Sequence, residues 1–169
     1  MYIANFIKCE VIFILNDVIE SVKIFNDVTL VTIYNMRKDD GRKSIFRKLA
    51  ESSINLDMIS QSPCFGGEIT LSFSLPDEDL PKTLSVISDY KSNHEKVETN
   101  VCSNNIIISF FSAKMVNSHG VAASVFEAFS NQDIDILLVT TSDISISCLV
   151  AKSDEVKIMR MLAKHNLEV

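Results

Sequence analysis

Two stretches of this chain can be laid over one another without a gap: SIFRKLAESSINLDMISQS, residues 44–62, and SVFEAFSNQDIDILLVTTS, residues 124–142. At an offset of 80 residues the apolar positions of the two stretches coincide, as when Phe46 falls on Phe126. Self-similarity at a fixed spacing is the signature of a duplicated structural unit. The chain is therefore predicted to contain two copies of one fold.

Each copy continues with the same series of elements. Strict alternation of apolar and polar residues predicts strands with one buried face, and helices are expected from a helical spacing of apolar residues. A second helix is expected after Pro76 in copy one, and after Ser153 as its N-cap in copy two. The predicted strands include residues 27–34, 69–75, 105–113 and 144–150.

The order in each copy is strand, helix, strand, strand, helix, and copy one closes with a strand at residues 96–101. This order predicts the α+β class, with two ferredoxin-like βαββαβ units that have antiparallel sheets and both helices on one face. The predicted domains are residues 19–101 and 102–169, preceded by an N-terminal segment, 1–18, that the pattern does not define. Copy two has little chain for a final strand, so residues 19–25 are expected to supply an edge strand.

Composition and charge narrow the classes of function. Apolar residues make up 47% and charged residues 22% of the chain, as in an ordinary globular domain. The net charge of -6 argues against nucleic acid or a membrane surface as a main partner. No apolar run approaches the roughly 20 residues that span a bilayer, and a signal peptide is not expected, so the location is expected to be cytoplasmic. The basic segment, residues 37–48, is interpreted as a solvated helix face or, alternatively, as a docking surface or anion contact.

Neither a metal nor a cofactor is expected. The four cysteines lack C-x-x-C spacing and the three histidines lie far apart, so the cysteines are expected to be reduced thiols. The chain has no glycine-rich phosphate loop and no Ser/His/Asp group of known geometry. No catalytic residues are assigned, and catalysis by this chain alone is not expected.

Three motifs resemble the regulatory region of aspartate kinase (aspartokinase), which is built from two ACT domains. They are SHGVAASVFEAF (118–129), DIDILLVTTSDISISCLV (133–150) and INLDMISQS (54–62). The resemblance implies an allosteric role in amino-acid biosynthesis, in which lysine, threonine or both bind at ACT–ACT interfaces and inhibit the kinase. It also implies a homodimer formed through the ACT sheets, and a kinase domain or catalytic subunit that phosphorylates L-aspartate with ATP. The K-F-G-G-type motif of that kinase domain is absent from this sequence.

The resemblance also assigns effector contacts to individual residues. Gln61 stands where the family often has a ligand-contacting glutamine, and Asp133 and Asp135 stand where asparagines often line a threonine-type site. The remaining assigned residues lie in the loops that lead into the first helix of each copy: Asn117, Ser118, His119, Gly120, Val121 and Ala122 in copy two, and Asp39, Asp40 and Gly41 in copy one.

The chemistry of a helix start supports such a site. The first backbone N–H groups of a helix have no internal partners and suit a ligand carboxylate. Gly120 lets a ligand approach the main chain, and carbonyl or Asp oxygens can accept hydrogen bonds from its ammonium. Asp133 and Asp135, however, would repel a carboxylate. The alternatives are an ACT sensor for another small molecule and a ligand-free ACT module for dimerisation or interaction.

Overall fold

The computed structural model describes residues 15–38 and 41–167, which fall into two compact units. The first unit comprises residues 27–105. The second comprises residues 1–26 and 106–169, of which 15–26 and 106–167 are described. This division differs from the predicted domains in residues 19–26 and 102–105. Residues 19–26 belong to the second unit because Ile19 and Val22 are buried in its core.

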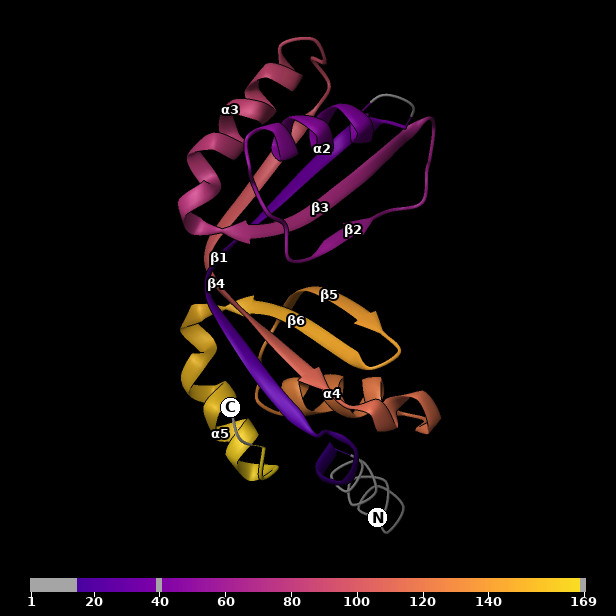
Figure 1. The fold of residues 1–169 in the computed structure, drawn as a ribbon, viewed down its shortest axis with the longest axis vertical. Coiled ribbons are helices and arrows are strands. Elements are labelled where there is room, and N and C mark those ends of the chain that lie inside the picture. The colour runs from indigo at the N-terminus through magenta and orange to yellow at the C-terminus, as the bar shows by residue number, and fades with distance from the viewer. Residues whose placement is uncertain (1–14, 39–40, 168–169) are drawn as a thin grey trace. The chain divides into compact units, whose positions relative to one another are not determined.

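The first unit is a four-stranded sheet in the order β2-β3-β1-β4, with α2 and α3 on one face (Figure 1). β3 pairs antiparallel with both β1 and β2. A 3-10 turn at Asp77–Asp79 leads into α3. The elements are β1 (Ser21–Arg37, from residue 27), α2 (Gly41–Glu51), β2 (Ile59–Gln61), β3 (Glu68–Pro76), α3 (Leu80–Lys91) and β4 (Glu98–Phe111, to residue 105).

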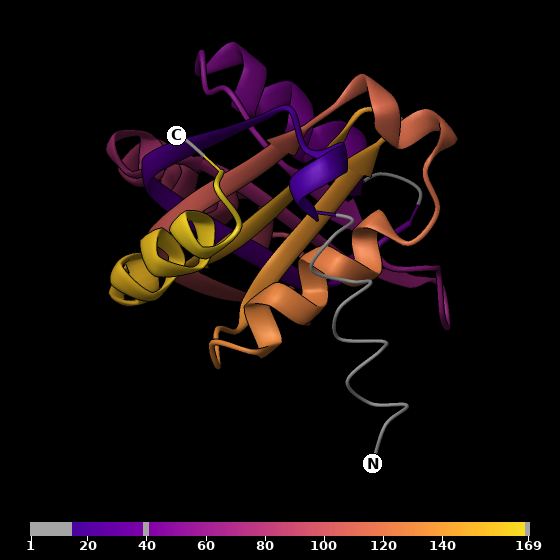
Figure 2. The ribbon, with the colours of Figure 1, turned by 90° about the horizontal axis from the view of Figure 1, so that it is seen from below.

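The second unit has the order β1-β4-β6-β5, and α4 and α5 cover one face of its strands (Figure 2). β5 pairs antiparallel with β6. 3-10 turns at Ala113–Asn117 and Lys152–Asp154 precede the two helices. The elements are β1 (residues 21–26), β4 (residues 106–111), α4 (Val121–Ser130), β5 (Ile136–Ser142), β6 (Ser145–Ala151) and α5 (Glu155–Lys164). Both units have the predicted α+β, ferredoxin-like architecture.

β1 and β4 are each one continuous strand where the sequence pattern predicts two. β1 joins the expected strands at residues 19–25 and 27–34, and β4 joins those at 96–101 and 105–113. Near the point where each strand leaves one unit and enters the other, a single residue has a left-handed backbone: Asp27 (φ 56°) and Asn104 (φ 61°). Asp and Asn tolerate this conformation better than most residues. The N-terminal part of β1 is the expected edge strand of the second unit.

The apolar faces of the two predicted amphipathic strands are buried with one exception, and Ser74, on the predicted polar face of the first strand, is buried as well. Ile69, Leu71, Phe73 and Leu75 are all buried in the first core. In the second core Ile146, Cys148 and Val150 are buried, whereas Ile144 lies in the β5–β6 turn and is 51% exposed. Burial raises the pKa of the Cys148 thiol to about 12, so this cysteine is a protonated core residue.

The predicted N-cap role of Ser153 is wrong. Ser153 lies inside the 3-10 turn, and Asp154 occupies the N-cap position without a side-chain capping bond. The Asp154 carboxylate instead lies 2.8 Å from Lys157 Nζ. An acidic residue in the first turn still complements the helix dipole. None of the described helices is long and apolar enough to cross a membrane.

Candidate functional site

The start of α4 has the backbone geometry expected of a binding turn. Gly120 is its N-cap, with a left-handed backbone (φ 83°, ψ 2°) and no side chain to cap the helix. Ser124 closes the first turn by donating from both its N–H (3.0 Å) and its hydroxyl (3.1 Å) to the Gly120 carbonyl. The N–H groups of the first helical residues therefore have no helical or N-cap partner. Val121 is buried and Ala122 is exposed.

The residues ahead of Gly120 form a short ordered turn. Ser112 caps the 3-10 helix at Ala113–Asn117 by accepting a hydrogen bond from Lys114 N. The Ser118 hydroxyl donates to the Lys114 carbonyl at 2.8 Å. Asn117 and His119 are exposed. The turn thus holds Gly120 at the surface with its polar neighbours facing solvent.

Asp133 and Asp135 lie at the other end of α4. A helix of ten residues is about 15 Å long, so the second unit does not bring these acids to the Gly120 turn. Both aspartates are exposed, and Asp133 has a left-handed backbone (φ 53°). Lys157 Nζ donates to the Asp133 carbonyl at 2.9 Å. Its pKa is raised by its hydrogen bond to Asp154 and by the nearby charges of Asp154, Asp133 and Asp135.

Gln61 lies beside the start of α2 in the first unit. Arg42 Nη1 donates to Gln61 Oε1 at 2.9 Å, and Gln61 Nε2 donates to the Ser62 carbonyl at 3.3 Å. Gly41, the first residue of α2, is buried. The Arg42 side chain thus links Gln61 to the first turn of α2.

Asp39 and Asp40 lie outside the described residues, so their predicted contacts stay predictions. Two cationic residues near the predicted sites were not expected: Arg42 at Gln61, and Lys157 at Asp133 and Asp135. Arg42 belongs to the basic segment, so the sequence contained a signal that could have pointed to this residue. Lys157 is 24 positions from Asp133, and no sequence pattern links the two.

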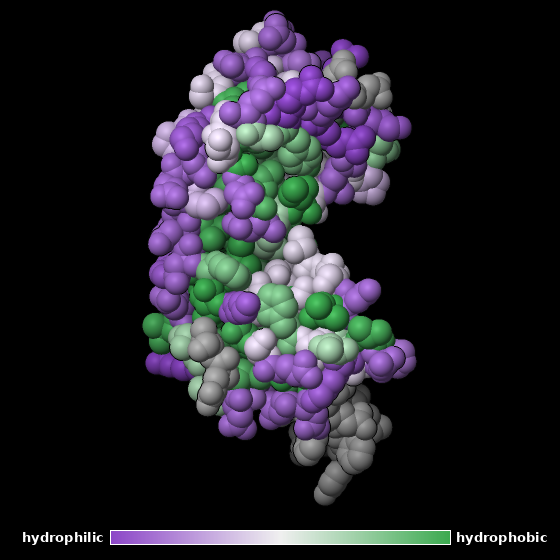
Figure 3. Space-filling model, in the orientation of Figure 1, coloured by the Kyte–Doolittle hydropathy of each residue, from purple (hydrophilic) through white to green (hydrophobic). Residues whose placement is uncertain are grey.

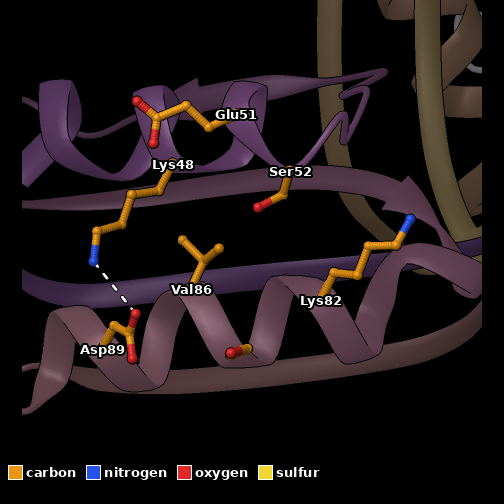
Figure 4. A pocket seen from close by; sticks show the side chains of 7 residues that line it. Lys48, Glu51, Ser52, Lys82, Val86 and Asp89 are labelled. Atoms are coloured by element: carbon orange, nitrogen blue, oxygen red, sulfur yellow. Dashed lines mark hydrogen bonds and ion pairs between the residues drawn. The ribbon is translucent and has the colours of Figure 1, made fainter.

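A groove of about 510 Å³ runs between α2 and α3 (Figure 4). Hydrophilic residues predominate over these helices on the face shown in Figure 3. Both lysines that line the groove are already paired: Lys48 lies 3.5 Å from Asp89, and Lys82 lies 3.0 Å from Asp79. Among the described residues, no group of three or more His, Cys, Asp or Glu side chains is placed to hold a metal ion.

Comparison with known proteins identifies the class. An ACT domain model matches residues 108–165. Aspartokinase 2 of Bacillus subtilis is 33% identical over 150 residues, which are 87% of this chain and 36% of that protein. The chain thus spans about a third of the length of this relative.

Solved structures share the fold. The ligand-free regulatory subunit of aspartate kinase from Thermus thermophilus superposes with a TM-score of 0.79 at 17% identity, covering 88% of this chain and 98% of that one. E. coli aspartokinase III, in complex with lysine and aspartate, superposes with a TM-score of 0.67 at 17% identity, covering 86% of this chain and 33% of that one.

Fold and sequence together define a protein built from tandem ACT domains. Within that class, the chain resembles the regulatory regions of the aspartate kinases (aspartokinases).

Proposed function

We propose that this chain is the amino-acid-sensing part of an aspartate kinase, and that it binds lysine, threonine or both to inhibit the kinase. The observation that carries the proposal is the α4 start, where Gly120 opens the backbone to a ligand and the first N–H groups lack helical partners. E. coli aspartokinase III, whose regulatory fold is similar, is known in complex with lysine.

The proposed site is completed between ACT units. Within the second unit the Gly120 turn and the Asp133–Asp135 pair are a helix length apart, so one unit offers only part of a site. A ligand carboxylate would accept hydrogen bonds from the N–H groups that follow Gly120. Its ammonium would be held by acceptors on the strand after the first helix, such as Gln61 in the first unit or Asp133 and Asp135 in the second.

Lys157 changes the electrostatics of the two aspartates. Its charge offsets part of theirs, which reduces the repulsion that they exert on a ligand carboxylate. The pair can therefore attract an ammonium without excluding a zwitterion. We therefore propose that Asp133 and Asp135 determine which effector binds, and that they do not abolish effector binding.

A thermal-shift screen of the full chain against the twenty amino acids tests this function. A ligand at about 100 times its dissociation constant stabilises a protein by about 2.7 kcal/mol. For a protein of this size that corresponds to roughly 5–10 °C in Tm. We expect this response to lysine or threonine at millimolar concentration or below, confirmed by calorimetry.

Asp135→Asn should alter the strength or identity of the amino-acid response. Asp143→Asn, in the exposed β5–β6 turn, removes the same charge away from the site and should leave the response unchanged. A flat response across all twenty amino acids would refute the sensing function.

Such a flat response would favour a ligand-free dimerisation module. The exposure of Ile59 (50%) on β2 and Leu137 (39%) on β5 favours contact with a partner, since both belong to edge strands. We propose a homodimer through the ACT sheets in either case. The partner that receives the signal would be a kinase domain or catalytic subunit; the Thermus thermophilus protein is itself a regulatory subunit.

A further inference from the structure

A hollow of about 560 Å³ lies at one end of the first unit, lined by the end of β1, the β2–β3 hairpin and the α3–β4 loop. Its wall carries three cationic residues: Arg37, Lys38 and Lys96. Arg37 and Lys38 begin the basic segment, residues 37–48, and neither of these two residues belongs to the proposed effector site. The hollow is built within one unit and does not include Gln61 or Gly41.

A bulge in β1 turns Arg37 to the surface beside the hollow. The pairing of β1 with β3 shifts register between Ile33 and Met36, and Asn35 has a left-handed backbone (φ 56°). Met36 is consequently fully buried, whereas its neighbour Arg37 is exposed. Bulges commonly re-aim side chains in this way at functional sites.

Hydrogen bonds hold the three walls of the hollow in place. Asn35 Nδ2 donates to the Lys96 carbonyl at 3.1 Å, and Lys38 N donates to the Gly67 carbonyl at 3.2 Å. The His94 ring stacks on Tyr90 with centroids 4.0 Å apart, and its Nδ1 donates to the Tyr90 carbonyl at 2.8 Å. The site is therefore preformed, which lowers the entropic cost of binding.

The cations of this hollow differ in their ion pairing from the lysines of the α2–α3 groove. Within the described part of the chain, Arg37, Lys38 and Lys96 make no ion pair. Two acids, Glu68 and Glu95, also line the hollow, so cations outnumber acids there although the whole chain has a net charge of -6. A concentration of unpaired cations attracts and holds a small anion.

We propose that this hollow binds a small anion with two negative charges through Arg37, Lys38 and Lys96. A guanidinium offers a planar pair of donors that matches a carboxylate or a phosphate. The volume falls within the range of small-molecule sites, about 300–1,000 Å³. Phosphates and dicarboxylates share this chemistry, and Glu68 and Glu95 favour an anion that also carries hydrogen-bond donors. The site is independent of the proposed effector site.

Isothermal titration calorimetry of the full chain tests the site with two probes, sodium phosphate and sodium succinate, at an ionic strength kept constant with sodium chloride. We expect saturable binding of at least one probe. Arg37→Gln should weaken that binding about tenfold or more, because a charged, bidentate contact is lost. Lys96→Gln is the second variant, and circular dichroism verifies that both variants fold.

Lys43→Gln is the matched control, since Lys43 is an exposed cation of the same basic segment that does not line the hollow. Binding of phosphate alone would identify a phosphorylated ligand, and binding of succinate alone a dicarboxylate. The proposal is overturned if neither probe binds beyond the chloride control, or if Lys43→Gln weakens binding as much as Arg37→Gln and Lys96→Gln. Lysine and threonine responses should persist in Arg37→Gln, which separates this test from that of the sensing function.

Discussion

Gly41 is the first residue of α2, and its α-carbon lies against the side chains of Met36 and Tyr90. A methyl group at this position would clash with Met36 Cγ and come within 2.7 Å of the Tyr90 oxygen. Met36 is fully buried and has little room to move. The glycine therefore sets how closely the start of α2 approaches the core of the first unit, next to Gln61 and Arg42.

Gly41→Ala is expected to lower the free energy of unfolding by about 1–3 kcal/mol, the usual cost of overpacking a core. Chemical denaturation of the full chain measures this change. Lys43→Ala, at an exposed position of the same helix, should stay within about 0.5 kcal/mol of the parent chain. Equal stability of Gly41→Ala and the parent would show that the helix start can shift to accept the methyl group.

At the scale of elements, the helix dipole and burial have opposite effects on the pKa of His165 at the end of α5. His165 is its C-cap, where the helix dipole favours a protonated imidazole. The side chain is nevertheless buried, and its Nδ1 has no hydrogen-bond partner among the described residues. Burial, together with the neighbouring charge of Lys164, lowers the pKa of His165 below its ordinary value. Desolvation therefore outweighs the dipole.

This lowered pKa predicts a pH dependence of stability. An unfolded histidine titrates near pH 6.5. As the pH falls below that value, the unfolded chain binds a proton that the folded chain does not, so the free energy of unfolding should fall until the lowered pKa is passed. Denaturation at pH 5.5–7.5 measures the slope. His165→Gln should reduce it, and His119→Gln, at an exposed site, should not. An unchanged slope in His165→Gln would assign it to other groups.

At the scale of the whole molecule, the two units are interleaved in sequence. The N-terminal part of β1 is an edge strand of the second unit, although residues 27–105 separate it in sequence from the rest of that unit. Val22 lies on this strand and is 4% exposed in the second core. The second unit can therefore complete its sheet only with residues from before the first unit.

Val22→Asp is expected to destabilise the second unit by several kcal/mol, because it buries an unpaired charge. Hydrogen exchange should become faster in α4 and α5 while α2 and α3 keep their protection. Phe25→Asp, on the same strand but at a residue that is 49% exposed, is the control and should have a much smaller effect. Equal loss of protection in both units would mean that they unfold as one cooperative body.

The sequence by itself determined the repeated element order, the apolar faces of the strands and the place where the first helix of each copy begins. These are local properties, because periodicity along the chain reports which face of an element is buried. It also singled out Gly120, which in the structure is the N-cap of α4 and has a left-handed backbone. Local patterns misjudged Ile144 and Ser153, since the spacing of apolar residues does not distinguish a turn from the adjoining strand or a 3-10 segment from the adjoining helix.

Only the tertiary structure decided where the boundary between the two units falls, and which distant charges meet. Lys157 reaches Asp133 from another helix, and Lys96 joins Arg37 from a loop far along the chain. Such contacts depend on which elements pack against one another. The periodicity of an element reports its buried face but not its partner. The sequence did not reveal that β1 and β4 are continuous, for the same reason. The partners of each strand change where it passes from one unit to the other, but its local pattern of extended residues stays the same.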